Sequence, residues 1–219
     1  MQASSISELD RLPPETGGLL VVAFGSLPLV AVIDRAIGFQ QPVVIGIHWV
    51  VAAIVLGGAV AVEDVSLGDV GLRRPAWVDV GYFLGTTIAA LAVFVFVGPL
   101  IEGLGVPTEE ATGGIGAEPD LVIGLVTAVT IGVVEEILYR GYAIERLLAY
   151  TDSAVVAGGL AWVVFVVAHT VVWPLGNLLQ IAAVSVVFIA VYLRRRRLAP
   201  VVGAHVCVWV LPVLATAFG

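Results

Sequence analysis

Long apolar runs separated by short polar segments account for most of this chain. A helix needs about 17–25 mainly apolar residues to cross a bilayer. Runs of that length lie at 19–37, 43–62, 78–101, 121–138 with a helical extension, 154–173, 175–193 and 200–218. The pattern predicts an all-α fold: a polytopic transmembrane helix bundle of about seven spans. We expect a polar N-terminal tail over residues 1–18 and a single transmembrane domain over residues 19–219.

Composition supports a membrane protein and excludes one class of partner. The 219 residues are 60% hydrophobic and 12% charged, whereas soluble domains have about 45–50% apolar and about 25% charged residues. All ten basic residues are arginine, and the formal net charge is −7. Without a basic face the chain is not expected to bind nucleic acid. An acidic chain without lysine is typical of a halophilic source.

The arginines predict how the chain crosses the membrane. Those that follow spans two, four and six are Arg73, Arg74, Arg140, Arg146 and Arg194–Arg197. They fall on one side if the spans alternate, and the positive-inside rule makes that side cytoplasmic. The loop from 102 to 120 carries glutamates and no arginine. We therefore expect an integral cell membrane protein in contact with membrane lipid, with its N-terminus in the cytoplasm and its C-terminus outside.

Three charges interrupt the apolar sequence in VVEEILYRGYAIER, residues 133–146. Glu136 and Arg140 are separated by four residues, so they share a helix face and can form an ion pair. Glu135 is rotated from Glu136 by about 100° and has no such partner. Ionisable residues within a membrane usually mark a functional site. The alternative is that the helix has left the bilayer here and that the charges are solvated.

Two histidines in apolar runs favour a buried site. Helical rise places Glu135 about 22 Å and His169 about 24 Å from the expected hairpin at 150–153, and His205 roughly 10 Å into the last span. We expect the three side chains to meet in the cytoplasmic half of the membrane, although a histidine in an apolar helix is more often a packed core residue. His48 has no nearby carboxylate in the sequence, so we interpret it as structural.

Three ordered motifs then suggest a family. They are EExxxR (Glu135, Glu136, Arg140), FxxxH (Phe165, His169) and a later histidine, His205, in the last apolar span. Together, over about residues 120–219, they resemble the CPBP or Abi family of CAAX-protease and bacteriocin-processing-type intramembrane endopeptidases. The resemblance implies an all-helical membrane fold with a buried site open to the cytoplasm. It also implies hydrolysis of peptide bonds in a peptide or protein substrate, by a water that glutamate and histidine activate.

The resemblance also implies a role for each motif residue. Glu135 would be the general base, His169 would help to hold the water and His205 would help to stabilise the oxyanion. Glu136 and Arg140 would support the site by fixing the helix and the local charge.

The pattern departs from that family at one position. Four residues after the last histidine the family usually has asparagine or a similar polar residue, and this chain has Trp209. An indole offers one N–H donor and no acceptor, so Trp209 either donates to the oxyanion or packs. We include it, with Phe165 of the FxxxH motif, among the supporting residues. The substitution leaves open a catalytically silent scaffold or partner-binding protein of the same fold.

Metal dependence and function have alternatives at this stage. One glutamate and two histidines form a known catalytic zinc ligand set, but they also suffice for metal-free glutamate chemistry. The sequence has no HExxH pair, and we favour the metal-free mechanism. A small transporter or channel using Glu135, His169 and His205 as an ion path is a further alternative. Transporters often contain internal repeats, and we find none in the sequence.

Overall fold

The computed structural model describes residues 12–109 and 120–218. Within those residues, seven helices are long and apolar enough to cross a membrane, which confirms the predicted all-α bundle. The elements are α1 (Pro14–Ile37), α2 (Gln41–Ala61), α3 (Trp77–Gly103), α4 (Leu121–Glu135), the π-helix η2 (Glu136–Ile144), α5 (Glu145–Thr151), α6 (Ala154–Ala168), the 3-10 turn η3 (His169–Val171), α7 (Leu175–Arg195) and α8 (Leu198–Phe218). Together α4, η2 and α5 form one span of 31 residues.

Two helix ends differ from the predicted spans. α1 begins at Pro14 and not at residue 19, because proline suits the first helical position and Glu15 favours a helix N-terminus. The Thr16 hydroxyl also donates to Glu63 in the loop after α2. Residues 1–11 of the predicted tail lie outside the described residues. The second difference is the end of α6, which lies at Ala168 and is followed by η3. Pro174 then requires an extended segment before α7.

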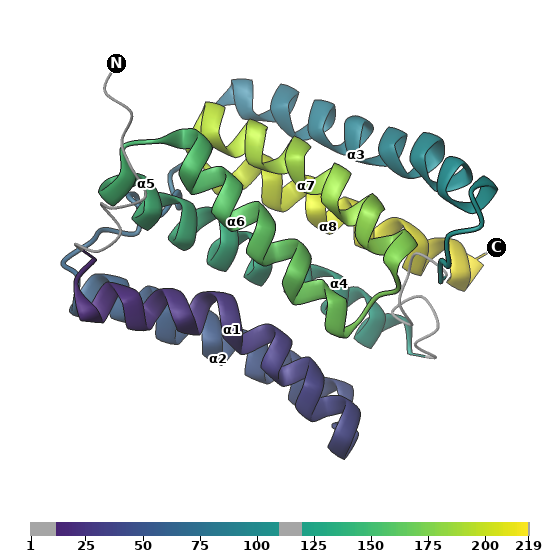
Figure 1. The fold of residues 1–219 in the computed structure, drawn as a ribbon, viewed down its shortest axis with the longest axis horizontal. Helices are drawn as coiled ribbons and strands as arrows, with labels where there is room; N and C mark the ends of the chain where they lie inside the picture. Colours follow the sequence, from purple (N-terminus) through teal and green to yellow (C-terminus); the bar gives the residue numbers. More distant parts are fainter. Residues whose placement is uncertain (1–11, 110–119, 219) are drawn as a thin grey trace.

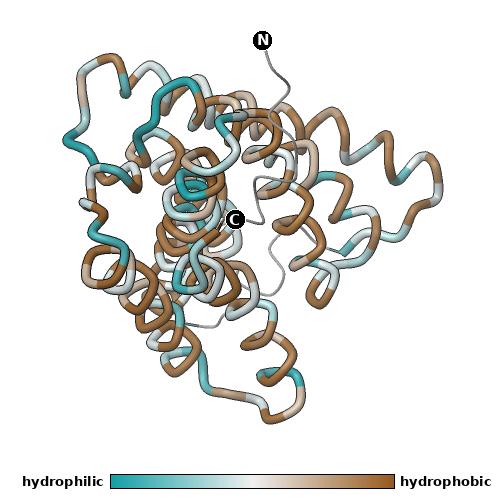
Figure 2. The backbone as a smooth tube through the Cα atoms, turned by 60° about the vertical axis from the view of Figure 1, so that its left-hand side comes forward, coloured by the Kyte–Doolittle hydropathy of each residue, from teal (hydrophilic) through white to brown (hydrophobic). Residues whose placement is uncertain are grey.

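The helices lie roughly parallel to the long axis of the molecule (Figure 1). α1 and α2 form an antiparallel pair along one side, α3 lies on the opposite side, and α4, α6, α7 and α8 lie between them. α8 packs against both α3 and α4, while α1 packs against α6 and η2. Hydrophobic residues dominate the helices, and the hydrophilic segments lie mostly where helices are connected (Figure 2). The central helices therefore hold the residues on which a buried site depends.

The arginines of two connections gather at one end of the bundle, which we call the arginine end (Arg73, Arg74 and Arg194–Arg197). There Arg195 Nη2 lies 2.7 Å from Asp79 Oδ1, and Arg196 pairs with Glu145. The Leu198 amide donates to the Gly71 carbonyl at 2.9 Å, which fixes the α7–α8 turn against the α2–α3 loop. The short connection between α1 and α2 lies at the other end.

Arg140 does not belong to this group. Its side chain is 2% exposed and lies inside the bundle. The expectation that it is a loop arginine is therefore wrong. The helix continues beyond it to Thr151, because the segment 136–144 is buried along its whole length. Arg140 contributes to a buried site and should not be counted in the charge rule.

Candidate active site

Close approach of α4 and α8 creates the site. A Cβ atom added at Gly132 would lie 2.8 Å from the backbone nitrogen of Val206. Small residues allow membrane helices to approach so closely. Gly132 precedes Glu135 by one helical turn, and Val206 follows His205 directly. The contact therefore brings the carboxylates of one helix to the imidazole of the other.

A π-helix begins directly after Glu135. The nine residues Glu136–Ile144 are all buried. A π-helix has hydrogen bonds from i to i+5, is rare, and is frequent at functional sites. The sequence gives no signal for it, since the spacing of Glu136 and Arg140 also fits an α-helix. In the wider helix the two side chains still meet, with Arg140 Nη1 3.1 Å from Glu136 Oε1.

Arg140 is held on several sides. Its Nη2 donates to Ser185 Oγ of α7 at 2.8 Å, and its guanidinium carbon lies 4.1 Å from the centre of the Phe165 ring. The second aromatic neighbour is Phe188, at 5.9 Å. Phe165 of the FxxxH motif thus contacts the arginine of EExxxR. Ser185 and Phe188 were missed in the sequence, where only a lone serine in an apolar helix marks the position.

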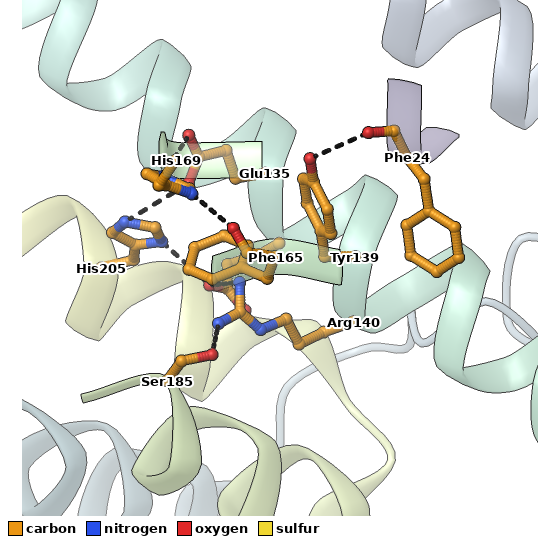
Figure 3. Close-up of polar contacts among 9 residues, drawn as sticks. Phe24, Glu135, Tyr139, Arg140, Phe165, His169, Ser185 and His205 are labelled. Atoms are coloured by element: carbon orange, nitrogen blue, oxygen red, sulfur yellow. Dashed lines mark hydrogen bonds and ion pairs between the residues drawn. The ribbon is translucent and has the colours of Figure 1, made fainter. Parts of the chain in front are cut away.

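Glu135, His169 and His205 come together as the helical rise predicted (Figure 3). His169 Nε2 lies 3.8 Å from Glu135 Oε1, and His205 Nε2 lies 3.9 Å from Glu135 Oε2. Glu135 is the last residue of α4, His169 is the first residue of η3, and His205 belongs to α8. Three separate spans therefore supply the three groups. Each of these side chains is partly exposed, between 12% and 15%.

Hydrogen bonds fix the orientation of both imidazoles. His169 Nδ1 lies 2.7 Å from the Phe165 carbonyl oxygen, and His205 Nδ1 lies 2.9 Å from Glu136 Oε1. A carbonyl only accepts, and so does a carboxylate paired with arginine, so each Nδ1 carries the proton. The Nε2 atom of each neutral imidazole then presents a lone pair to Glu135. Glu136 therefore serves two groups at once, Arg140 and His205.

Two cavities meet at these residues. The larger cavity has a volume of about 360 Å³ and is lined by α1, α2, α4, η3 and α8, including Glu135, His169 and Trp209. It extends to Asp34 and Gln41 beside the α1–α2 connection, away from the arginine end. The smaller cavity, about 60 Å³, shares those three residues and lies toward α7. Glu135 thus lies where a chamber for a ligand joins a pocket for a few water molecules.

Trp209 and His48 are two further ring side chains near the site. Trp209 stacks on Trp173, with ring centroids 6.4 Å apart and an angle of 25° between the planes. The residue that departs from the family pattern lines the same two cavities as Glu135. His48 Nδ1 lies 2.8 Å from the carbonyl oxygen of Val44, which belongs to the same helix. His48 also lines the larger cavity.

The arrangement of Glu135, His169 and His205 can be compared with a zinc site. Zinc bonds to His nitrogen or carboxylate oxygen are about 2.0–2.2 Å long, which sets tetrahedral ligand atoms about 3.4 Å apart. The two imidazoles approach different oxygens of Glu135, at 3.8 and 3.9 Å. In the part of the chain that the structure describes, no three His, Cys, Asp or Glu side chains are grouped to hold a metal ion.

Comparison with known families agrees with the motifs. Residues 117–211 match the family model described as "Type II CAAX prenyl endopeptidase Rce1-like". This description agrees with the CPBP/CAAX protease family. The Rce1-like region contains Glu135, Glu136, Arg140, Phe165, His169, His205 and Trp209. Neither the comparison with curated proteins nor the comparison with solved structures gave a match.

The match confirms the resemblance that the motifs suggested. At the level of the family, the matched region is similar to endopeptidases of the CAAX-protease type. Together with seven apolar helices in the described residues, it makes the chain an integral membrane protein. α1, α2 and α3 precede the matched region. Two of those three helices, α1 and α2, form one wall of the larger cavity.

Proposed function

We propose that the protein is an intramembrane endopeptidase that hydrolyses peptide bonds of membrane-associated substrates with a water activated by Glu135 and two histidines. The observation that carries the proposal is the set of acceptors around Glu135. Two imidazole lone pairs and a carboxylate face one another at 3.8 and 3.9 Å. These distances are too long for direct hydrogen bonds. A water molecule, which has two protons to donate, suits a position among three acceptors.

The proposed reaction follows from these positions. Glu135 accepts a proton from the water, and the water oxygen attacks the carbonyl carbon of the substrate. The Trp209 indole N–H stabilises the resulting oxyanion. The neutral His205 Nε2 accepts a hydrogen bond from the hydroxyl group that came from the water, and takes its proton as the carboxylate forms. The proton on Glu135 then passes to the leaving nitrogen as the carbon–nitrogen bond breaks, which gives a carboxylate and an amine. A positioned general base contributes about 10²–10⁴-fold to such a rate.

Glu136 and Arg140 have a positioning role in this proposal. Because Arg140 neutralises Glu136 at 3.1 Å, Glu136 is a fixed acceptor for His205 Nδ1. That hydrogen bond directs His205 Nε2 toward the reacting atoms. Glu135 has no arginine partner among the described residues and is free to exchange a proton.

We also propose an orientation in the membrane. The arginine end faces the cytoplasm by the positive-inside rule, so the start of α1 is cytoplasmic and the end of α8 is outside. The larger cavity extends to the opposite end, beside Asp34 and Gln41. With this orientation a substrate reaches Glu135 from the outer side. We propose this route in place of the cytoplasmic route that the resemblance implies.

The decisive experiment replaces the proposed base. The protein is reconstituted in lipid vesicles with dye-quenched peptides that contain an apolar segment, and cleavage is followed by fluorescence. Glu135→Gln keeps the size of the side chain and should lower kcat by about 10²-fold or more. Glu102→Gln, at an exposed acid of α3, is the matched control and should retain the wild-type rate.

Two results would count against the proposal. Unchanged cleavage by a folded Glu135→Gln variant would exclude Glu135 as the base. If the wild-type protein cleaves no peptide, and both the wild type and Glu135→Gln bind the same partner, the silent scaffold is favoured. Incubation with a chelator should leave cleavage unchanged, and a loss that added zinc restores would instead support the metal-dependent alternative.

A further inference from the structure

The larger cavity has an unusual balance of charge. Its lining contains two carboxylates, Asp34 and Glu135, and no arginine. Its other lining residues are mostly apolar, and they include Leu27, Ile131 and Trp173. A charge taken from water into such surroundings is costly unless an opposite charge meets it. The cavity therefore suits a ligand that carries no negative charge.

Asp34 lies where the cavity reaches the α1–α2 connection. One of its oxygens, Oδ1, accepts a hydrogen bond from the Phe39 amide at 2.8 Å. The adjacent Arg35 is bound to the Val171 carbonyl, and no ion pair of Asp34 occurs among the described residues. Asp34 also lies in the last turn of α1, where the helix dipole adds negative potential. In the part of the chain that the structure describes, Asp34 therefore has no ion-pair partner.

Arg140 does not supply the missing positive charge. It lines the smaller cavity and not the larger one. At about 60 Å³, the smaller cavity is well below the range of about 300–1,000 Å³ for ordinary ligand pockets. Three amino-acid residues do not fit there. Arg140 is also already paired with Glu136.

The length of the chain after the scissile bond limits where the terminal carboxylate of a substrate can lie. In a C-terminal CAAX sequence the chain ends three residues after its cysteine. Three extended residues span at most about 10–11 Å. If the bond after the cysteine lies at Glu135, the terminal carboxylate must lie within about 10–11 Å of Glu135. Of the two cavities at Glu135, the larger one has room for the three residues that follow the cysteine.

We infer that the enzyme cleaves internal bonds of apolar, uncharged segments and discriminates against a free carboxylate close to the scissile bond. The inference rests on the proposed endopeptidase function. It assigns Asp34 as a residue that determines specificity, because its charge opposes that of the substrate terminus. Like charges placed together in a binding site weaken binding. We expect a preference of at least about tenfold in kcat/KM for a neutral terminus.

Paired peptides test the inference. Both members have the same apolar sequence and end three residues after the scissile bond, one with a free carboxylate and the other with an amide. The amide should be cleaved at least about tenfold faster in kcat/KM by the reconstituted wild type. Asp34→Asn should reduce that ratio several-fold by faster cleavage of the carboxylate peptide. Asp64→Asn, at a loop residue near the arginine end with φ 55°, should leave the ratio unchanged.

A binding measurement separates this inference from the proposed function. The same two peptides, with the scissile amide N-methylated and a dye attached, are titrated against wild-type protein and followed by fluorescence anisotropy. Weaker binding of the carboxylate peptide supports the inference even if no peptide is cleaved. Equal or tighter binding of the carboxylate peptide, or an unchanged ratio in Asp34→Asn, overturns it. If no variant cleaves either peptide but the binding preference is retained, the result counts against the proposed endopeptidase function and leaves the inference about the terminus intact.

Discussion

The buried ion pair of Glu136 and Arg140 leads to a quantitative prediction. Their nearest atoms are 3.1 Å apart, and the side chains are 0% and 2% exposed. At an effective dielectric constant near 20, two unit charges at that distance attract by about 5 kcal/mol. Removing one partner of a buried pair usually costs about 3–5 kcal/mol, because the other charge is left without compensation. Glu136→Gln should therefore destabilise the protein by about 3–5 kcal/mol.

The replacement by glutamine makes the result specific. A glutamine oxygen can still accept the hydrogen bond from His205 Nδ1, which is 2.9 Å long in the structure. The change therefore removes the charge and keeps an acceptor for His205. Arg140 would then keep Ser185 Oγ and the rings of Phe165 and Phe188 as neighbours, but no opposite charge. Arg140→Met should also destabilise, and the double variant should lose less than the sum of the two single losses.

Thermal unfolding in detergent, followed by circular dichroism, measures these differences. For a chain of this size about 1 kcal/mol corresponds to about 2–4 °C in Tm, so each single variant should unfold about 6–20 °C lower. Arg197→Met is the control. Arg197 is 29% exposed and lies 3.8 Å from Asp79, and such pairs contribute about 0–1 kcal/mol. Single losses below about 1 kcal/mol, or strictly additive losses in the double variant, would refute the reasoning.

Three further predictions concern the site and its orientation. Gly132→Ala places a Cβ 2.8 Å from a backbone atom of α8, so it should cost about 1–3 kcal/mol in thermal unfolding and reduce cleavage by separating Glu135 from His205. Trp209→Phe keeps an aromatic ring and removes the N–H, so it should lower kcat by about 10²–10³-fold with little change in KM. With Cys207→Ala as background, a cysteine at Gln40 should react with a membrane-impermeant thiol reagent from outside the cell, and a cysteine at Ser66 should react only in inverted vesicles.

Each of these has a matched comparison. Gly159→Ala adds a Cβ where no atom lies within 4 Å and should leave stability and cleavage unchanged. Trp77→Phe changes a tryptophan that is 93% exposed and should retain the wild-type kcat. If Trp209→Phe also retains it, the indole only packs. Labelling of the Gln40 cysteine only in inverted vesicles would reverse the orientation that we propose.

The spans could be predicted from the sequence because each is a nearly unbroken apolar run. The pairing of Glu136 with Arg140 follows from their spacing, and the level of His169 with Glu135 follows from the rise of two antiparallel helices. These features depend on one element, or on two elements joined by a short turn. They need no knowledge of how distant helices pack.

Other features depend on packing between distant segments. The contact of Gly132 with Val206 and the support of Arg140 by Ser185 join residues far apart in the chain, and no local pattern marks them. The π-helix was missed because its residues are compatible with an α-helix. The direction of the larger cavity was also missed. It depends on how α1 packs against α6 and α2 packs against α4.

The unequal lengths of two adjacent spans have a consequence for hydration. The span that carries Glu135 has 31 residues, while the one that leads to His169 has 18. At 1.5 Å per residue the first is about 46 Å long and the second about 27 Å, and the hydrocarbon core is about 30 Å thick. We expect lipid to thin beside the short span, which would bring the headgroups closer to His169. Local thinning would supply water to the hydrolysis, and would make turnover sensitive to the acyl-chain length of the host bilayer.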